Sequence, residues 1–207
     1  MPGMRMPSGW PIVGWTAVAV AGIVAALLAV AGTGEPGIRL VIRATARTSV
    51  LLFGGAFVAA ALDRAWPTRA SRWMLANRRY LGVSFAVSHF VHLLAIIALA
   101  GWSLRRAAAD AGLPVVLLGG TAYLFLLAMT ATSFDRTAAW LGPRAWSRLH
   151  TTGVYVLWTV FFVSFAPRIT ESALYWPFAL GLLAAMVLRL TYSRRRALRP
   201  VFSPVSS

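Results

Sequence analysis

Long apolar segments alternate with short polar or turn-rich segments along the whole chain. A helix needs about 20 apolar residues to cross the roughly 30 Å hydrocarbon layer of a membrane. Six segments approach or reach this length, and they cover residues 10–31, 49–62, 81–102, 113–132, 151–165 and 174–192. Each is expected to be helical, because lipid offers no hydrogen-bond partners to a free backbone. The pattern therefore predicts an all-α protein, an integral membrane bundle of six transmembrane helices.

The second segment is short for a span, so we expect it to start earlier, near Leu40, as an interrupted helix. Turn-rich connections lie between the segments, for example GTGEPG at 32–37 and SFDRTAAWLGPRAW at 133–146. No connection is long enough to fold alone, so residues 1–207 are expected to form one domain with loose tails at 1–9 and 200–207. The first segment is not followed by a signal-peptide cleavage pattern and is interpreted as a retained helix.

Composition supports the membrane interpretation and excludes several kinds of chemistry. The chain is 59% hydrophobic and only 12% charged, with a mean hydropathy of +0.72, whereas about a quarter of the residues of a soluble domain are charged. There are no cysteines, which excludes disulfides, iron–sulfur clusters, thiolate zinc sites and cysteine nucleophiles. All 20 basic residues are arginine. Schiff-base and P-loop lysine chemistry is therefore excluded as well.

The net charge of +15 could indicate a nucleic-acid partner. The arginines lie between the apolar segments, however, where they would face lipid headgroups, so we expect contact with membrane lipid and not with nucleic acid. If the N-terminus faces the cytoplasm, fourteen of the 20 arginines lie on that side of the membrane and six on the other. The positive-inside rule then places both termini in the cytoplasm.

The candidate functional residues are three histidines: His89 and His92 in the third apolar segment, and His150 at the start of the fifth. Ionisable side chains inside a membrane usually face the bundle interior, where a histidine can carry protons, bind a metal or ligate haem. The alternative is that these rings pack and form hydrogen bonds between helices. All five acidic residues lie in connections or at segment ends, so a non-haem metal centre or a buried proton relay lacks carboxylates. Haem needs only one or two imidazoles and an apolar slot.

Three stretches of sequence carry a resemblance to a known family. RRYLGV at 78–83 leads into a helix with a histidine ten residues after its glycine. TSFDRTAAWLGPRAWSRLHTTGVYVLW at 132–158 has a tryptophan and an arginine just before its histidine, and VLRLTYSRRR at 187–196 closes the last helix. Together they resemble the ferric-reductase-like transmembrane domain, and most closely the MsrQ-type haem-binding membrane subunit of the bacterial methionine sulfoxide reductase system.

This resemblance implies a b-type haem protein of the bacterial inner membrane. It would pass electrons from quinol or a flavoprotein partner to an acceptor protein on the extracytoplasmic side, as the haem-binding subunit of an oxidoreductase system. Any quinone or flavin would come from a partner. No catalytic residue of this chain's own is expected. The alternative is a haem-free membrane scaffold or assembly partner with the same fold.

By the same resemblance, His92 and His150 would be axial ligands of the haem iron, and His89 has no counterpart. Arg144 and Arg148 would pair with the haem propionates, or else serve only as interfacial anchors. The family's further histidine on the fifth helix corresponds here to Val163. At about 1.5 Å per residue, His92 lies roughly 20 Å beyond Arg79. By the same rise His150 lies only about 3 Å beyond Arg148, so ligation of a haem by a single histidine stays open beside ligation by the pair.

Overall fold

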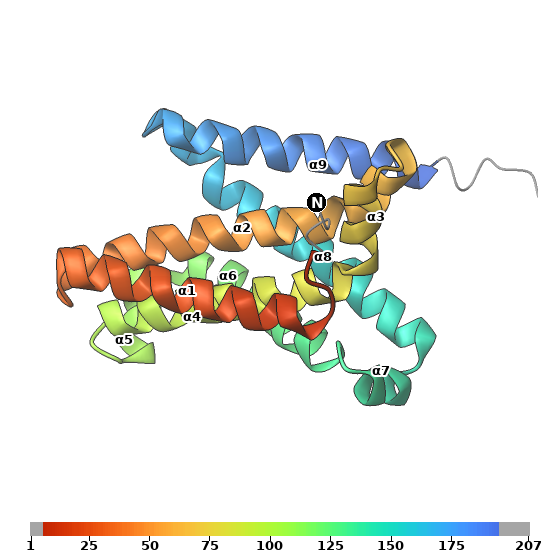
Figure 1. The fold of residues 1–207 in the computed structure, drawn as a ribbon. Helices are drawn as coiled ribbons and strands as arrows, with labels where there is room; N and C mark the ends of the chain where they lie inside the picture. The colour runs from red at the N-terminus through yellow and green to blue at the C-terminus, as the bar shows by residue number, and fades with distance from the viewer. Residues whose placement is uncertain (1–5, 195–207) are drawn as a thin grey trace, which may run out of the picture.

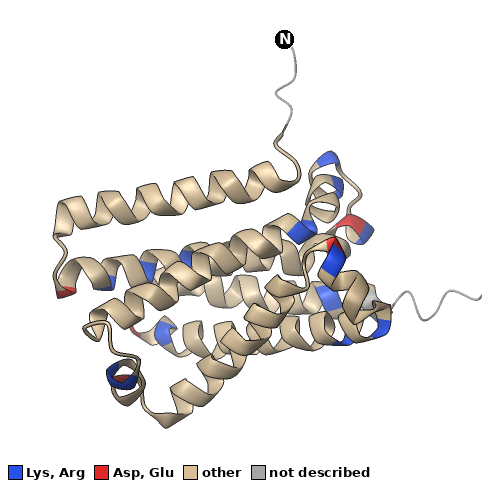
Figure 2. Cartoon of the chain, turned by 90° about the horizontal axis from the view of Figure 1, so that it is seen from below, with Lys and Arg blue, Asp and Glu red and all other residues tan. Residues whose placement is uncertain are grey.

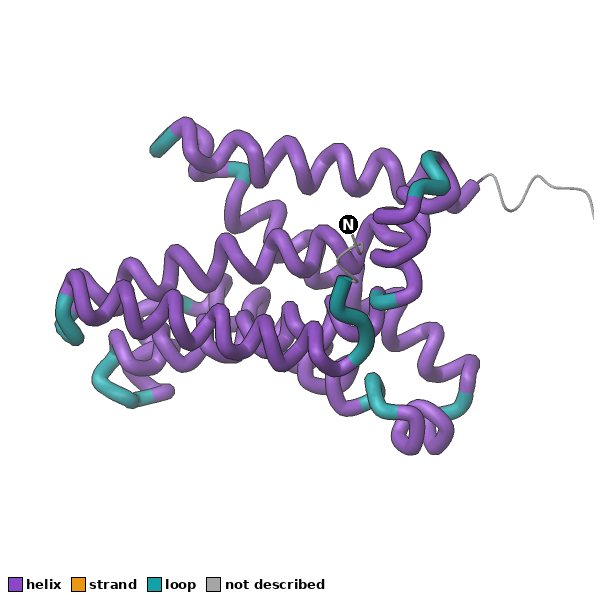
Figure 3. Tube along the Cα trace, in the orientation of Figure 1, coloured by secondary structure: helices purple, strands orange, loops and turns teal. Residues whose placement is uncertain are grey.

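The computed structural model describes residues 6–194, and no strand is present in this range (Figures 1 and 3). Six long helices are apolar enough to cross a membrane, which makes the chain a multi-pass membrane protein. The long helices are α1 (Trp10–Ala31), α2 (Glu35–Ala65), α4 (Arg78–Leu99), α6 (Leu113–Ala131), α8 (Pro143–Phe165) and α9 (Trp176–Arg194). Short helices lie in the connections: α3 (Arg69–Ala76), α5 (Leu104–Ala111), α7 (Asp135–Leu141), η1 (Pro167–Thr170) and η2 (Ala173–Tyr175). The prediction of an all-α bundle with six spanning helices is confirmed.

Two predicted boundaries are wrong. The second span is one uninterrupted helix of 31 residues that begins at Glu35. Its first turns carry arginines and are not apolar, so hydropathy alone missed them. Helix α8 begins at Pro143 and not near residue 151, so the polar stretch before His150 is helical and not a loop. Proline in the first turn fits this start, because the nitrogen there needs no partner within the helix.

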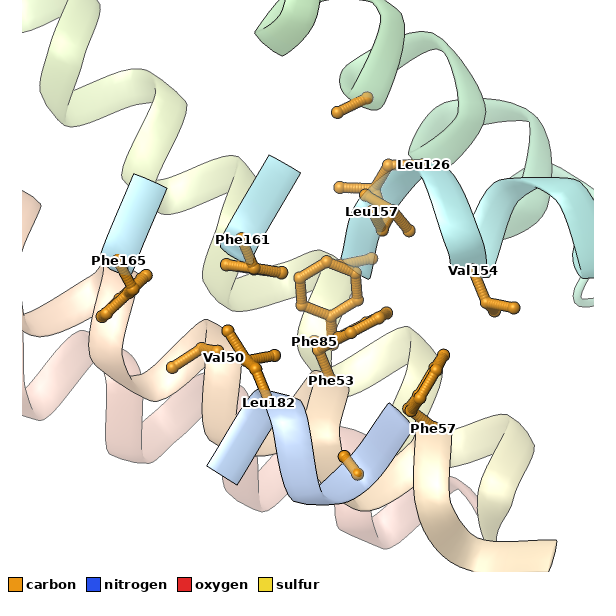
Figure 4. Close-up of a cluster of buried hydrophobic side chains, with 13 residues drawn as sticks. Val50, Phe53, Phe57, Phe85, Leu126, Val154, Leu157, Phe161, Phe165 and Leu182 are labelled. Carbon is orange, nitrogen blue, oxygen red and sulfur yellow. The ribbon is translucent and has the colours of Figure 1, made fainter. Parts of the chain in front are cut away.

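The apolar core lies where α2, α4, α6, α8 and α9 meet (Figure 4). Helix α2 is central, since it packs along α4 and also contacts α1, α3 and α9. Helix α8 packs against α6 and α9. Three phenylalanines from three helices, Phe53, Phe85 and Phe161, meet with ring centroids 5.3 to 5.7 Å apart at the middle of this cluster.

Small polar residues let α2 and α4 approach each other closely. Ser49 and Ser88 are completely buried, and the Ser49 hydroxyl donates a hydrogen bond to the Ser88 hydroxyl at 3.0 Å. The Ser88 hydroxyl donates in turn to the carbonyl oxygen of Thr45 at 3.3 Å. Small side chains and hydrogen bonds between helices are the usual means of helix association in lipid, where apolar burial alone gives no preference for protein over lipid. This polar strip fixes the faces that α2 and α4 turn toward each other.

Arginines gather at one end of the bundle (Figure 2). We call this the basic end; it is the end at which α1, α4 and α8 begin and α2, α6 and α9 finish. The far end carries fewer arginines. The described arginines of the basic end, apart from those in the last helix, are Arg64, Arg69, Arg72, Arg78, Arg79, Arg136, Arg144 and Arg148.

The predicted loose tails lie mainly outside the described residues, which leave out 1–5 and 195–207. The expectation for residues 7–9 is wrong, because hydrogen bonds hold this stretch to the bundle. The Gly9 backbone N–H donates to the Asn77 side chain at 2.9 Å, and the Trp73 indole N–H donates to the Pro7 carbonyl at 2.9 Å. The chain just before α1 is thereby fixed to the connection between α3 and α4.

Candidate functional site

His89 and His92 lie on the face of α4 that is turned into the bundle, and their rings stack. The ring centroids are 5.2 Å apart and the planes differ by 10°. Tyr123 of α6 also stacks with His89, with centroids 4.9 Å apart. The Tyr123 hydroxyl donates to the backbone carbonyl of His89 at 3.1 Å, which holds the stack in place. The structure thus brings together two of the three predicted site histidines.

Hydrogen bonds fix the protonation of the His92 ring. Its Nδ1 lies 3.0 Å from the carbonyl oxygen of Ile42 and 3.2 Å from the Thr45 hydroxyl. The Thr45 hydroxyl already donates its hydrogen to the Val41 carbonyl at 2.7 Å, so it can only accept from His92. Nδ1 therefore carries the hydrogen and donates to α2, and Nε2 carries the lone pair. This is the arrangement of a metal-ligating histidine, whose other ring nitrogen donates to a carbonyl or carboxylate.

His89 is more deeply buried, with a relative exposure of 9%. Its Nδ1 is shielded from solvent and makes no hydrogen bond with any residue that the structure describes. Leaving such an atom unpaired costs about 1 to 3 kcal/mol, so each case calls for an explanation. Phe85 and Phe161 complete the surroundings, each with its centroid 5.3 Å from that of the His89 ring. The aromatic side chains of Phe85, Phe161 and Tyr123 therefore fill the space next to the His89 ring.

His150 stands apart from the α4 histidines. Its Nε2 lies 3.0 Å from the Thr132 hydroxyl, and that hydroxyl donates its own hydrogen to the Ala128 carbonyl at 2.7 Å. His150 therefore donates from Nε2 and keeps the lone pair on Nδ1. The indole of Trp146 stacks on the imidazole, with centroids 4.1 Å apart. His150 is thus held by α6 and by its own helix near the basic end.

Depth in the bundle separates His92 from His150. The His89 ring touches Phe161, which lies eleven residues beyond His150 on α8. At about 1.5 Å per residue this places His150 roughly 16 Å nearer the basic end than His89, and His92 lies a further turn away. In this structure His92 and His150 therefore cannot bind the same iron atom.

Three other positions named in the sequence analysis point away from the histidines. Val163, which stands where the family has its further histidine, is 44% exposed on the outside of the bundle, and Phe161 faces the α4 histidines instead. Arg148 precedes His150 by two residues, which is about 200° around the helix. Arg144 and Arg148 are both exposed and line a hollow at the outer surface of α8. The structure thus does not bring them to the face of α8 that carries His150.

The sequence analysis did not single out Arg189 of α9. Its guanidinium donates to the Phe57 carbonyl at 2.8 Å and lies over two rings, 4.5 Å from the centroid of Phe57 and 5.4 Å from that of Tyr155. Cation–π contacts of this kind gain strength away from water. The signal was available in the sequence, because an arginine inside an apolar segment is rare and usually faces the bundle interior.

Among the described residues, no group of three or more histidine, cysteine, aspartate or glutamate side chains could hold a metal ion together. A porphyrin brings four ligands of its own and needs only an axial imidazole.

In comparisons with known proteins, no family model, no curated protein and no solved structure matches the chain. The family resemblance in the sequence therefore stays a prediction.

Proposed function

We propose that the chain is a membrane electron-transfer protein that binds b-type haem, with His92 Nε2 as an axial ligand. The observation that carries the proposal is the hydrogen bonding of His92. Its Nδ1–H is engaged by Ile42 and Thr45, and its Nε2 lone pair has no hydrogen-bond partner among the described residues. An imidazole nitrogen that keeps its lone pair in an apolar, membrane-spanning helix is suited to bind haem iron.

The surroundings of His92 also fit a porphyrin in chemical terms. The nearby side chains are aromatic or apolar, and the unpaired Nδ1 of His89 is a second polar atom that a bound group could satisfy. When bound, haem supplies a one-electron carrier. The protein's own groups hold the imidazole rings. Helix α2 fixes the tautomer and orientation of His92, and the Tyr123 hydroxyl donates a hydrogen bond to the backbone of His89.

His89 and His92 would not clamp one iron between them. The two residues are only three positions apart on one helix, and their rings stack on each other. A porphyrin placed between the two rings would therefore collide with the α4 backbone. One histidine of α4 per haem follows from this geometry. His150, with its free Nδ1, is a separate candidate ligand near the basic end, at a different depth.

The charge distribution supports an orientation of the chain in the membrane. The arginine-rich end is proposed to face the cytoplasm of a bacterial inner membrane, by the positive-inside rule. His92 lies roughly 20 Å along α4 from Arg79, so it is nearer the far end. From the family resemblance, we propose quinol or a flavoprotein as the donor and a protein on the extracytoplasmic side as the acceptor. The chain has no cysteine, so single cysteines placed at Arg69 and at Arg105 would report the orientation. With a membrane-impermeant maleimide on intact cells, only the cysteine at position 105 should be labelled. Labelling at position 69 alone would reverse the proposed orientation of the chain.

Haem binding is tested on the full-length protein, purified after expression with excess haem precursor. The wild type should show reduced Soret and α bands after dithionite, and a haem-to-protein ratio can be measured. His92→Phe should abolish the bands that His92 holds, and His89→Phe should keep them, because it preserves the ring stack. His150→Ala, measured in parallel, shows whether a second haem is held near the basic end. Full bands in the His92→Phe variant would remove His92 as a ligand.

A haem-free membrane scaffold of the same fold is the competing candidate. The observation that favours it is the packing of Phe161 and Tyr123 against His89, which occupies space that a porphyrin would need. The same experiment decides between the two. A wild-type protein without haem bands, despite ample haem supply, supports the scaffold.

A further inference from the structure

An open groove of about 770 Å³ runs between α6 and α8 on the outer surface of the bundle. Its α6 wall is the first half of that helix, and its α8 wall is one face of the residues just past His150. The lining is apolar apart from threonine and tyrosine hydroxyls. It consists of Pro114, Leu117, Leu118, Thr121, Thr151, Thr152, Tyr155, Val156 and Thr159.

A second hollow, of about 520 Å³, continues this groove toward the basic end. The two share Thr151 and Thr152, so they form one continuous surface groove along α8, which is called the channel below. The second hollow is formed by the first two turns of α8 and is lined by Arg144 and Arg148. The channel is therefore apolar along most of its length and cationic at one end.

The cationic end has no anionic partner in the part of the chain that the structure describes. The salt bridges among the described residues are Arg39–Glu35 and Arg79–Asp135, and neither involves Arg144 or Arg148. No side chain caps the first turn of α8, so backbone N–H groups of that turn also point toward the hollow's end of the helix. Free N–H groups and the helix dipole attract an anion at this place.

A third positive group stands behind the groove wall. Tyr155 lines the groove, and its ring lies over the guanidinium of Arg189, 5.4 Å from the centroid. This charge is fixed within the bundle by the bond to the Phe57 carbonyl. The channel thus combines an apolar trough with positive charge at and beside one end, which is the complement of an amphiphile with an anionic headgroup.

We propose that this channel is a binding site for one anionic phospholipid of the surrounding membrane. The phosphate-bearing headgroup lies against Arg144, Arg148 and the first turn of α8, and an acyl chain lies along the trough between α6 and α8. Arginine suits this task because its guanidinium can form two parallel hydrogen bonds to phosphate. The bound lipid fills the groove between the two helices.

The test uses the full-length protein in detergent micelles, titrated with phosphatidylglycerol or with phosphatidylcholine of identical acyl chains and followed by native mass spectrometry. A basic residue near an anionic membrane surface gains about fivefold in affinity, so two arginines should favour phosphatidylglycerol about 25-fold. The double variant R144Q/R148Q should lose this preference. The matched control R105Q/R106Q, on α5 at the far end, should keep it.

A second variant tests the trough separately from the charges. Leu118→Trp places a large ring in the groove and should weaken binding of both lipids by a similar factor. Equal binding of the two lipids to the wild type would overturn the proposal. So would equal behaviour of R144Q/R148Q and R105Q/R106Q, or a Leu118→Trp variant that binds both lipids as the wild type does.

Discussion

Gly153 of α8 lies against Met129 and Phe125 of α6, and this contact gives a sharp test of how the two helices pack. A methyl group added at Gly153 would lie 2.2 Å from Met129 Sδ, 3.3 Å from Met129 Cγ and 3.2 Å from Phe125 Cδ1. To restore even a 3.4 Å contact, the sulfur must move by 3.4 minus 2.2, about 1.2 Å. Phe125 and the rest of Met129 limit that movement, because they already lie against the same methyl position.

Two opposing terms set the effect of Gly153→Ala. Forcing a methyl group into a filled contact costs about 1 to 3 kcal/mol. Alanine in place of glycine within a helix returns about 0.5 to 1 kcal/mol. The net result should be a loss of about 0 to 2.5 kcal/mol in the free energy of unfolding. In a Met129→Ala background the shortest contact is absent and only the 3.2 Å contact with Phe125 Cδ1 remains, so the same substitution should cost less or be neutral.

The assay is reversible unfolding in mixed detergent micelles, with the four proteins of the double-mutant cycle measured together. Gly181→Ala on α9 is the matched control, since nothing lies within 4 Å of the added methyl group and no loss is expected. The cycle should give a coupling energy of about 1 to 3 kcal/mol between positions 129 and 153. An unchanged cost in the Met129→Ala background, or an equal cost for Gly181→Ala, would refute the packing argument.

Two further substitutions contrast a buried and an exposed polar contact, both measured by the same unfolding assay. Ser88→Ala should cost about 1 kcal/mol, because it removes the acceptor for the buried Ser49 hydroxyl between α2 and α4, and Ser49→Ala in that background should cost little more. A fully additive pair would show that this hydrogen bond does not couple the helices. Asp135→Asn should change stability by less than about 1 kcal/mol, although its carboxylate lies 2.6 Å from Arg79, because the aspartate side chain is 93% exposed. A larger loss would mean that the ion pair is shielded from water.

Several features of the site could be predicted from sequence because they depend on composition and spacing. Three histidines in an apolar chain without cysteine or intramembrane carboxylate favour haem as the bound group, and haem binding stays a prediction. The three-residue spacing of His89 and His92 predicts a shared helical face, and the structure confirms that their rings stack. The relation of His92 to His150 was not predictable in the same way, because it depends on where α8 begins and on how far α4 and α8 are shifted along each other.

The sequence by itself determined the helical class, the number of spans and the uneven distribution of arginine, because the membrane imposes a fixed length and denies partners to free backbone groups. Only the tertiary structure decided which side chains meet. The tautomer of His92 depends on carbonyl and hydroxyl oxygens of α2, some fifty residues earlier in the chain. The apolar groove is lined by residues 114–121 of α6 and residues 151–159 of α8. Such contacts join residues far apart in sequence, and hydropathy carries no information about them.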